Sequence, residues 1–298
     1  MNEPAIEGQK LVKRFGKLTA VSDLTFAVKP GEVVGFLGPN GAGKTTTIRM
    51  LMGFLRPTSG EGRVLGGSLW HKPALRRRVG YLPGDFRVDP ALTGRELFSW
   101  FGSLRGNFDR SRVEALAERF HLDPTRRFSE LSKGNRQKVG IVQAFMHEPD
   151  VLILDEPTSG LDPLLQREFL DLVAEAKERG AAVFFSSHVL PEVSKAADRV
   201  AIIRQGQLVA LSTVDEMLDR ARHHLELRYA APPPAEVFVG VPGVVSAERS
   251  GRDLTITVDG PVGPAMRAAS SVDGLLRVSS AGDELEQIFV SLYGRDSG

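Results

Sequence analysis

The segment from Gly38 to Thr46 has the residue types and spacing that bind phosphate groups. It reads Gly38-Pro39-Asn40-Gly41-Ala42-Gly43-Lys44-Thr45-Thr46, which fits the pattern G-x-x-x-x-G-K-[ST]. Glycines let successive backbone N–H groups curl around phosphate oxygens, because no Cβ atom blocks the approach. Lys44 would reach the β- and γ-phosphates, and the Thr45 hydroxyl would hold Mg²⁺. The segment therefore predicts a site for a nucleoside triphosphate.

Residues on both sides of this segment predict the strand and the helix that such a site needs. The run Glu32–Leu37 is mostly apolar and predicts a buried strand. The run Thr46–Leu51 contains no helix breaker and predicts the first turns of a helix that ends near Gly53. The helix N-terminus would add the positive end of its dipole to the phosphate site.

Two carboxylates and a histidine directly follow two further apolar runs. The run Val151–Leu154 predicts a central buried strand, and Asp155 and Glu156 come immediately after it. Open α/β sheets bind ligands at the carboxyl ends of their strands, so these acids would lie near the phosphate loop. Asp155 can orient Mg²⁺, and Glu156 can polarise an attacking water. His188 directly follows the run 181–187, which predicts another buried strand. A lone histidine is usually structural, but this one can point at the same crevice.

Two other segments leave a choice between a structural and a binding role. Phe15 lies in Arg14-Phe15-Gly16-Lys17, and its ring is either a core aromatic at a strand end or a stacking surface for a base. The segment Leu131–Asn135 precedes a helical pattern. Ser132 and Gly134 would lie at that helix N-terminus, either as an anion site or with Ser132 as a plain N-cap. Taken alone, this segment favours the plain N-cap.

Composition narrows the class of protein. The chain has 298 residues, of which 42% are hydrophobic and 25% charged, with a net charge of +1. These values are ordinary for a globular protein and give no bias toward nucleic acid. The absence of cysteine excludes disulfides, cysteine zinc sites and thiol catalysis. No apolar run approaches the roughly 20 residues that cross a bilayer.

The remaining patterns predict the order of the elements. Residues 5–30 predict two strands, and residues 93–128 predict a helical block between strands. Strands around Gln205-Gly206 predict a closing hairpin. Pro232-Pro233-Pro234 marks a change of composition, after which a small α+β module is expected. Its candidate elements include a strand over Val237–Val241 and a helix over Glu284–Tyr293.

In this order, the motifs resemble the ATP-binding subunit of ABC transporters. Residues 38–46 look like the Walker A loop, and residues 151–156 look like Walker B with its catalytic glutamate. Between them, Leu131–Asn135 is similar to the LSGGQ signature, with lysine and asparagine variants. Ser159–Asp162 resembles the D-loop, His188 the switch histidine and Phe15 the aromatic A-loop residue. The resemblance covers roughly residues 5–222 and favours base stacking for Phe15.

This resemblance implies a fold and a mechanism. The fold would be α/β: a P-loop ABC-type ATPase over residues 5–222, with a RecA-like core, an antiparallel β subdomain and a helical subdomain at about 90–148, followed by a C-terminal α+β domain over 223–298. Lys44, Glu156 and His188 would act in hydrolysis of ATP, with Mg²⁺ as cofactor. Ser132 and Gly134 would serve the ATP bound to a second copy of the chain, in a homodimer or with a related subunit.

The resemblance also implies partners and a subgroup. An integral membrane permease would be the partner, at the cytoplasmic face of the membrane, and no nucleic acid is expected. The signature variant, Tyr81-Leu82-Pro83 and Leu285–Gly294 look like the ABC-2 exporter group, which includes drug and antibiotic efflux ATPases. Two alternatives are a soluble ABC ATPase acting on DNA or ribosomes and an importer ATPase.

One position departs from the family pattern. The family usually has a glutamine after a strand like Val79–Pro83, where it contacts Mg²⁺ and the attacking water. Gly84 stands there in this chain, followed by Asp85. We hypothesise that Asp85 replaces the glutamine as an outer Mg²⁺ ligand.

Overall fold

The computed structural model describes residues 3–106, 109–219 and 222–280. The chain divides into two compact units, Met1–Leu211 and Ser212–Gly298. This division lies before the boundary at residue 222 that the sequence suggested, so the segment after Leu211 groups with the C-terminal module.

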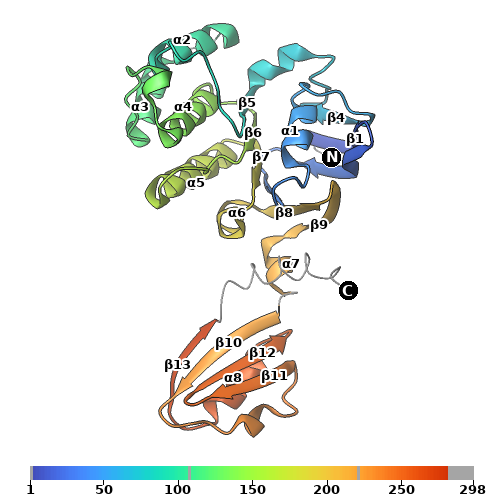
Figure 1. Ribbon diagram of the computed structural model, residues 1–298, viewed down its shortest axis with the longest axis vertical. Coiled ribbons are helices and arrows are strands. Elements are labelled where there is room, and N and C mark those ends of the chain that lie inside the picture. The colour runs from blue at the N-terminus through green and yellow to red at the C-terminus, as the bar shows by residue number, and fades with distance from the viewer. Residues whose placement is uncertain (1–2, 107–108, 220–221, 281–298) are drawn as a thin grey trace. The chain divides into compact units, whose positions relative to one another are not determined.

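The main sheet has six strands in the order β5-β6-β7-β3-β8-β9 (Figure 1). Its strands are β3 Val33–Leu37, β5 Val79–Leu82, β6 Val151–Asp155, β7 Ala182–Ser187, β8 Arg199–Arg204 and β9 Gln207–Thr213. The neighbouring strands β5, β6, β7, β3 and β8 are all parallel. Every residue of β3, β6 and β7 is buried. Leu37 pairs with Ser187 and Asp155 with Ser186, so the carboxyl ends of β3, β6 and β7 meet at one edge.

The expected hairpin after β8 is confirmed. Gln205 and Gly206 both have positive φ, of 47° and 79°, which suits a two-residue turn between neighbouring strands.

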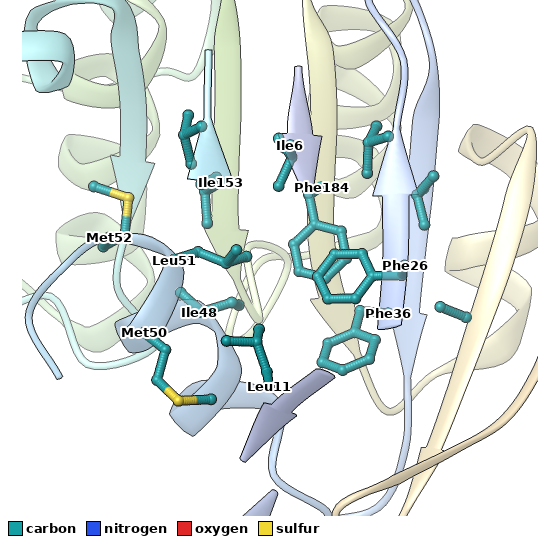
Figure 2. Packing of buried hydrophobic residues seen from close by; sticks show 14 of the residues in the cluster. Ile6, Leu11, Phe26, Phe36, Ile48, Met50, Leu51, Met52, Ile153 and Phe184 are labelled. Carbon is teal, nitrogen blue, oxygen red and sulfur yellow. The ribbon is translucent and has the colours of Figure 1, made fainter. Parts of the chain in front are cut away.

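A second, antiparallel sheet packs on the first through a shared core. Its order is β2-β1-β4, from β1 Ile6–Phe15, β2 Leu18–Val28 and β4 Ser59–Val64. Figure 2 shows Phe26 of β2 beside Phe36 and Phe184 of the main sheet. The Phe184 ring lies 5.1 Å from each of the other two rings, and all three are buried. Ile48 of α1 (Lys44–Leu51) belongs to the same core, which therefore fixes the helix that follows the phosphate loop.

The expected helical block is confirmed. It contains α2 Gly94–Arg105, α3 Arg110–Arg119 and α4 Lys133–Phe145, grouped together in Figure 1. Each helix has a side-chain cap at its start: Thr93 forms a capping box with Glu96, while Asp109 and Ser132 cap the other two. The block joins the main sheet where α4 crosses β5. A Cβ atom on Gly140 would lie 2.4 Å from Leu82 Cδ1, so a larger residue there would require the Leu82 side chain to move.

The other helices of the first unit are short or follow the main-sheet strands. They are the 3₁₀ turns Pro73–Arg78 and Phe128–Glu130, α5 Pro163–Glu178 and α6 Leu190–Ala196. Asp162 caps α5, and Pro163 occupies its first position.

The second unit has its own sheet and core. After α7 (Val214–Asp219), four antiparallel strands follow the order β11-β12-β10-β13. They are β10 Arg222–Tyr229, β11 Val244–Ser250, β12 Asp253–Asp259 and β13 Leu275–Ser280, with α8 Gly263–Ser270 between the last two. Alternate residues of β10 and β12 are buried with the small side chains of α8, and the Tyr229 hydroxyl donates to Ala269 O at 3.0 Å.

One predicted strand of this unit is wrong. Residues Ala235–Phe238 form a 3₁₀ turn after the proline run, and Val239 N bonds to Glu236 O rather than to a neighbouring strand. Phe238 alone supplies a buried anchor there, while Val239 is 81% exposed. The expected helix over Glu284–Tyr293 lies outside the described residues. Within the described ranges, no helix is long and apolar enough to cross a membrane.

Candidate active site

The phosphate loop connects β3 to α1 and requires glycine at several positions. Gly41 and Gly43 have φ of 81° and 110°, a region that side chains rarely adopt. A Cβ atom at Gly43 would lie 2.6 Å from Ala20 O, and one at Gly38 would lie 2.5 Å from Ile203 O. The loop is therefore packed against β2 and β8. Its helix begins at Lys44, two residues before the start that the sequence predicted.

Lys44 is held inside the loop. Its side chain is 6% exposed, and Nζ donates to the carbonyl oxygens of Gly38 and Pro39. The same Nζ lies 3.2 Å from Glu156 Oε1. An ammonium group with three donors at this place can bind phosphate oxygens, and the ion pair brings Glu156 to the same point.

Asp155 joins the loop to the neighbouring strands of the sheet. Thr45 Oγ1 donates to Asp155 Oδ2 at 2.7 Å, and Ser186 Oγ donates to Asp155 Oδ1 at 2.6 Å. Asp155 and Ser186 are both almost completely buried. Two hydroxyl donors therefore fix both oxygens of this carboxylate.

Glu156 adopts an uncommon backbone conformation that three hydrogen bonds maintain. Its φ is 49°, in the left-handed region that non-glycine residues rarely occupy. Its N–H donates to Ser186 Oγ at 2.9 Å, and Gln137 Nε2 donates to the carbonyls of Glu156 and Pro157 at 3.1 and 2.8 Å. The carboxylate then lies between Lys44 and His188, whose Nδ1 is 2.8 Å from Glu156 Oε2. The predicted group of Lys44, Thr45, Asp155, Glu156 and His188 is thus assembled at one edge of the sheet.

Thr45 and Asp155 have a geometry that suits Mg²⁺. The two oxygens that face each other are 2.7 Å apart. Neighbouring oxygens of an octahedral Mg²⁺ shell are about 2.9 Å apart when each bond is about 2.0–2.1 Å. The described residues contain no group of three or more His, Cys, Asp or Glu side chains suited to a metal ion. The protein therefore offers part of a shell that water and substrate phosphates would complete.

Asp85 does not join this group. Its carboxylate pairs with Arg87 at 2.6 Å on the surface, and this hydrogen bond lowers the pKa of Asp85. Gly84 lies against the site instead, because a Cβ atom there would be 3.2 Å from Asp155 Oδ2. The geometry gives no support to Asp85 as an outer ligand of the metal.

The signature segment packs on the loop that follows β6. Ser132 is exposed, and its Oγ accepts from Asn135 N at 3.3 Å, so it is an N-cap. A Cβ atom at Gly134 would lie 2.7 Å from Gly160 O, and Lys133 Nζ donates to Ser159 Oγ at 3.2 Å. The structure therefore groups the signature with the D-loop segment, while Ser132 remains accessible to another molecule.

Phe15 is the last residue of β1, and it is 48% exposed. The interpretation as a core aromatic is therefore wrong. Lys13 Nζ lies 5.0 Å from the ring centre. Stacking on a base stays a prediction.

Sequence reasoning missed the residues that hold the predicted ones in place. Ser186 and Gln137, described above, are two of these residues, and Glu192 of α6 is a third. Glu192 accepts from Thr158 Oγ1 at 2.6 Å and from Ser187 Oγ at 3.1 Å. It thereby ties the loop after β6 to the end of β7. For Ser186 and Ser187, the available signal was a pair of hydroxyls ending an apolar run, the same signal that identified Asp155 and His188.

Comparison with known proteins identifies the family. The family model described as "ABC transporter" matches residues 21–159. A bacitracin transport ATP-binding protein, BcrA of Bacillus licheniformis, is 34% identical over 97% of this chain and 97% of its own length. The probable multidrug ABC transporter ATP-binding protein YbhF of Escherichia coli K12 is 38% identical over 72% of this chain. The chain spans 38% of the length of that second relative.

A solved structure agrees with the fold. The structure of an ATP-binding subunit of an ABC transporter superposes with a TM-score of 0.67 at 32% identity, covering 72% of this chain and 91% of that one. Fold, site and relatives lead to one conclusion. The chain belongs to the ABC transporter ATP-binding proteins.

Proposed function

We propose that this chain is the ATP-hydrolysing subunit of an ABC exporter that moves a drug, an antibiotic or a lipid-like compound through a separate permease. The observation that supports it is the assembly of Lys44, Thr45, Asp155, Glu156 and His188 at one sheet edge. The relatives named for multidrug and bacitracin transport support an exporter over a DNA-bound, ribosomal or import ATPase.

The arrangement performs hydrolysis mainly by positioning and by stabilising charge. Backbone N–H groups of the loop and Lys44 would bind the phosphates of ATP. Thr45 and Asp155 would hold Mg²⁺, which neutralises charge on the phosphates when bound. Glu156 would orient the attacking water and accept its proton, because its carboxylate lies 3.2 Å from the Lys44 ammonium and therefore close to the phosphates that Lys44 would bind. His188, 2.8 Å from Glu156, would hold that carboxylate and contact the γ-phosphate.

Two copies of the chain would form the complete site. One chain has one phosphate loop and one signature segment, and its own signature contacts the D-loop segment near Gly160. Ser132 is exposed at the start of α4, where the helix dipole favours an anion. A second copy would therefore present Ser132 and Gly134 to the γ-phosphate bound by the first. A related subunit in place of the second copy is the alternative.

The permease is expected to dock on the first unit. The surface from Gly84 to Thr93 and the neighbouring helical block would receive it, because Gly84 lies beside Asp155 and a movement there could transmit changes at the metal site. The chain would then lie at the cytoplasmic face of the membrane, held by its partner.

Substitution of the proposed base tests the chemistry. Glu156→Gln keeps the shape of the side chain and removes its basicity, so ATP affinity should stay within about threefold while turnover falls by about 10²–10⁴. Glu61→Gln, an exposed carboxylate of β4, serves as the matched control and should behave as wild type. ATP binding by calorimetry and phosphate release would be measured for both variants. Wild-type turnover in Glu156→Gln would exclude the role of Glu156.

Purification with membrane partners tests the transport role. Tagged protein would be isolated from gently solubilised membranes of its own host, and integral membrane proteins that accompany it would be identified. A permease at near-equal amounts supports the exporter. Ribosomal or DNA-bound proteins in its place would overturn the exporter and leave the ATPase chemistry standing.

A further inference from the structure

Phe15 lies at the tip of the hairpin that β1 and β2 form, where the hydrophobic core gives it little support. It pairs with Leu18 across a turn in which Gly16 has a φ of 58°. Phe15 and Leu18 are 48% and 67% exposed. An exposed ring at the end of a strand moves freely unless other groups hold it. If this ring is to bind a base, the hairpin tip needs a support from outside the core.

The segment 56–58, which lies between α1 and β4, provides such a support. Thr58 N–H donates to Val12 O at 2.8 Å, and Arg14 N–H donates to Thr58 Oγ1 at 3.0 Å. One residue of this segment thus binds the backbone of β1 at two positions just before Phe15. The tip of the hairpin is therefore fastened to a second part of the chain.

Lys13 connects the same segment to the ring itself. Its Nζ donates to Arg56 O at 2.8 Å and lies 5.0 Å from the centre of the Phe15 ring. The pairing of β1 with β2 shifts its register on both sides of Lys13, and such irregularities re-aim the side chains beside them. The negative face of an aromatic ring attracts an ammonium group. Lys13 therefore occupies one face of the ring and leaves the other face for a base.

This connection also relates the base surface to the phosphate loop. The segment 56–58 follows α1, which begins at Lys44 of the loop and is fixed in the core by Ile48. The base and the phosphates are two ends of one nucleotide, so the surfaces that bind them must keep a fixed separation. A ring that is held in place before binding reduces the entropy lost when the nucleotide binds.

We propose that Lys13 is a positioning residue for nucleotide binding. It anchors the Phe15 ring to the segment 56–58, so that the opposite face of the ring receives the base of ATP. The proposal rests on the proposed function and on the prediction that a base stacks on Phe15. Stacking uses only the flat face of a base. Lys13 should therefore strengthen the binding of ATP and GTP by the same factor and leave the binding of a ligand without a base unchanged.

Removal of the ammonium group is the first test. Lys13→Met keeps a long apolar stem and loses both the contact with the ring and the bond to Arg56 O. Calorimetry without Mg²⁺, which prevents hydrolysis, would give Kd for ATP, GTP and tripolyphosphate. Kd for both nucleotides should rise about threefold to tenfold, less than the rise of about 5- to 100-fold expected for Phe15→Ala. Kd for tripolyphosphate and kcat for ATP should stay at the wild-type values.

A double-mutant cycle tests whether Lys13 acts through Phe15. If it does, Lys13→Met should change Kd for ATP by less than about 1.5-fold in a chain that already carries Phe15→Ala. Lys13→Arg keeps a cation and a donor, so its Kd for ATP should lie within about twofold of the wild-type value. Lys29→Met is the matched control, because Lys29 directly follows β2 at the far end of the same hairpin. This control should bind all three ligands like the wild type.

The outcomes separate this proposal from the one beneath it. Wild-type Kd for ATP in Lys13→Met, or the same loss with and without Phe15, would overturn the positioning role. A lowered unfolding temperature with an equal loss for all three ligands would make Lys13 a structural residue and would also overturn it. In each of these cases the ATPase function stands. If the wild-type protein neither binds nor hydrolyses ATP, the proposed function itself fails.

Discussion

Ser186→Ala is the substitution that most directly tests how the site is held together. The hydroxyl donates to the Asp155 carboxylate at 2.6 Å and accepts from Glu156 N–H at 2.9 Å. Both bonds involve buried groups next to the proposed chemistry. Ser186 itself would touch neither ATP nor water, so it is a positioning residue for two carboxylates with different tasks.

The two lost bonds set the expected magnitude. A hydrogen bond to a charged group contributes about 1.5–3 kcal/mol, and a buried N–H left without a partner costs about 1–3 kcal/mol. Partial relaxation reduces their sum, so we expect a loss of about 2–4 kcal/mol in the free energy of unfolding. For a unit of this size, a loss of about 3 kcal/mol lowers the unfolding temperature by about 6–12 °C.

The effect on turnover should be larger than the effect on ATP binding. Without Ser186, the left-handed backbone of Glu156 loses one of its restraints, and a displacement of about 1 Å at a reacting group can cost about 10² in rate. The phosphates are bound mainly by the loop and Lys44, so KM for ATP should change less than threefold. The Mg²⁺ concentration for half-maximal rate should rise, because one oxygen of Asp155 is no longer oriented.

The assay is phosphate release at 25 °C, well below the unfolding temperature, with ATP and Mg²⁺ titrated separately. Ser194→Ala provides the matched control, since its hydroxyl bonds only to Pro191 O at 3.2 Å among its described partners on α6. Ser186→Ala with wild-type kcat and wild-type Mg²⁺ dependence would refute the positioning role, whatever its stability.

Three further predictions follow from single contacts. Burial, followed by the charge of Arg105, lowers the pKa of His147 to about 3, below the unfolded value of about 6.5. The contribution of neutral His147 to the free energy of unfolding should therefore be fully present well above pH 6.5 and should fall by about 1.4 kcal/mol by pH 5.5. In urea unfolding measured across this pH range, His147→Gln should show a weaker dependence on pH. Asp85→Ala should leave turnover and its Mg²⁺ dependence unchanged, because that carboxylate pairs with Arg87; a shifted Mg²⁺ requirement would restore a metal role. Glu192→Ala removes the acceptor for two hydroxyls and should lower kcat, while Glu192→Gln keeps an oxygen there and should retain it; equal kcat in both variants would contradict this link.

Local patterns were enough to predict the chemistry of this chain. The spacing of glycines before Lys44, and the polar residues placed directly after apolar runs at Asp155 and His188, are short-range features. Parallel strands bring their carboxyl ends to one edge, so such residues converge whenever the runs become neighbouring strands. The helical block was also predictable from sequence, because the spacing of apolar residues and the capping residue of a helix lie within or next to that helix in the chain.

Other features depend on contacts between distant residues. The bond from Ser186 to Asp155 spans 31 positions, and the register of β6 against β7 creates it. Asp85 follows Gly84 by one residue, yet only the folded loop turns its carboxylate to Arg87 while Gly84 faces Asp155. The segment Val237–Val241 has the apolar content of a strand, but no strand of the described residues pairs with it, and Ala235–Phe238 forms a 3₁₀ turn.

The sequence by itself determined which groups could bind and hydrolyse a nucleotide, since residue type and spacing fix their chemistry. The tertiary structure alone decided which of them meet and which side chains restrain them. The physical reason is that burial and pairing are properties of the space between elements, and no single element contains that information.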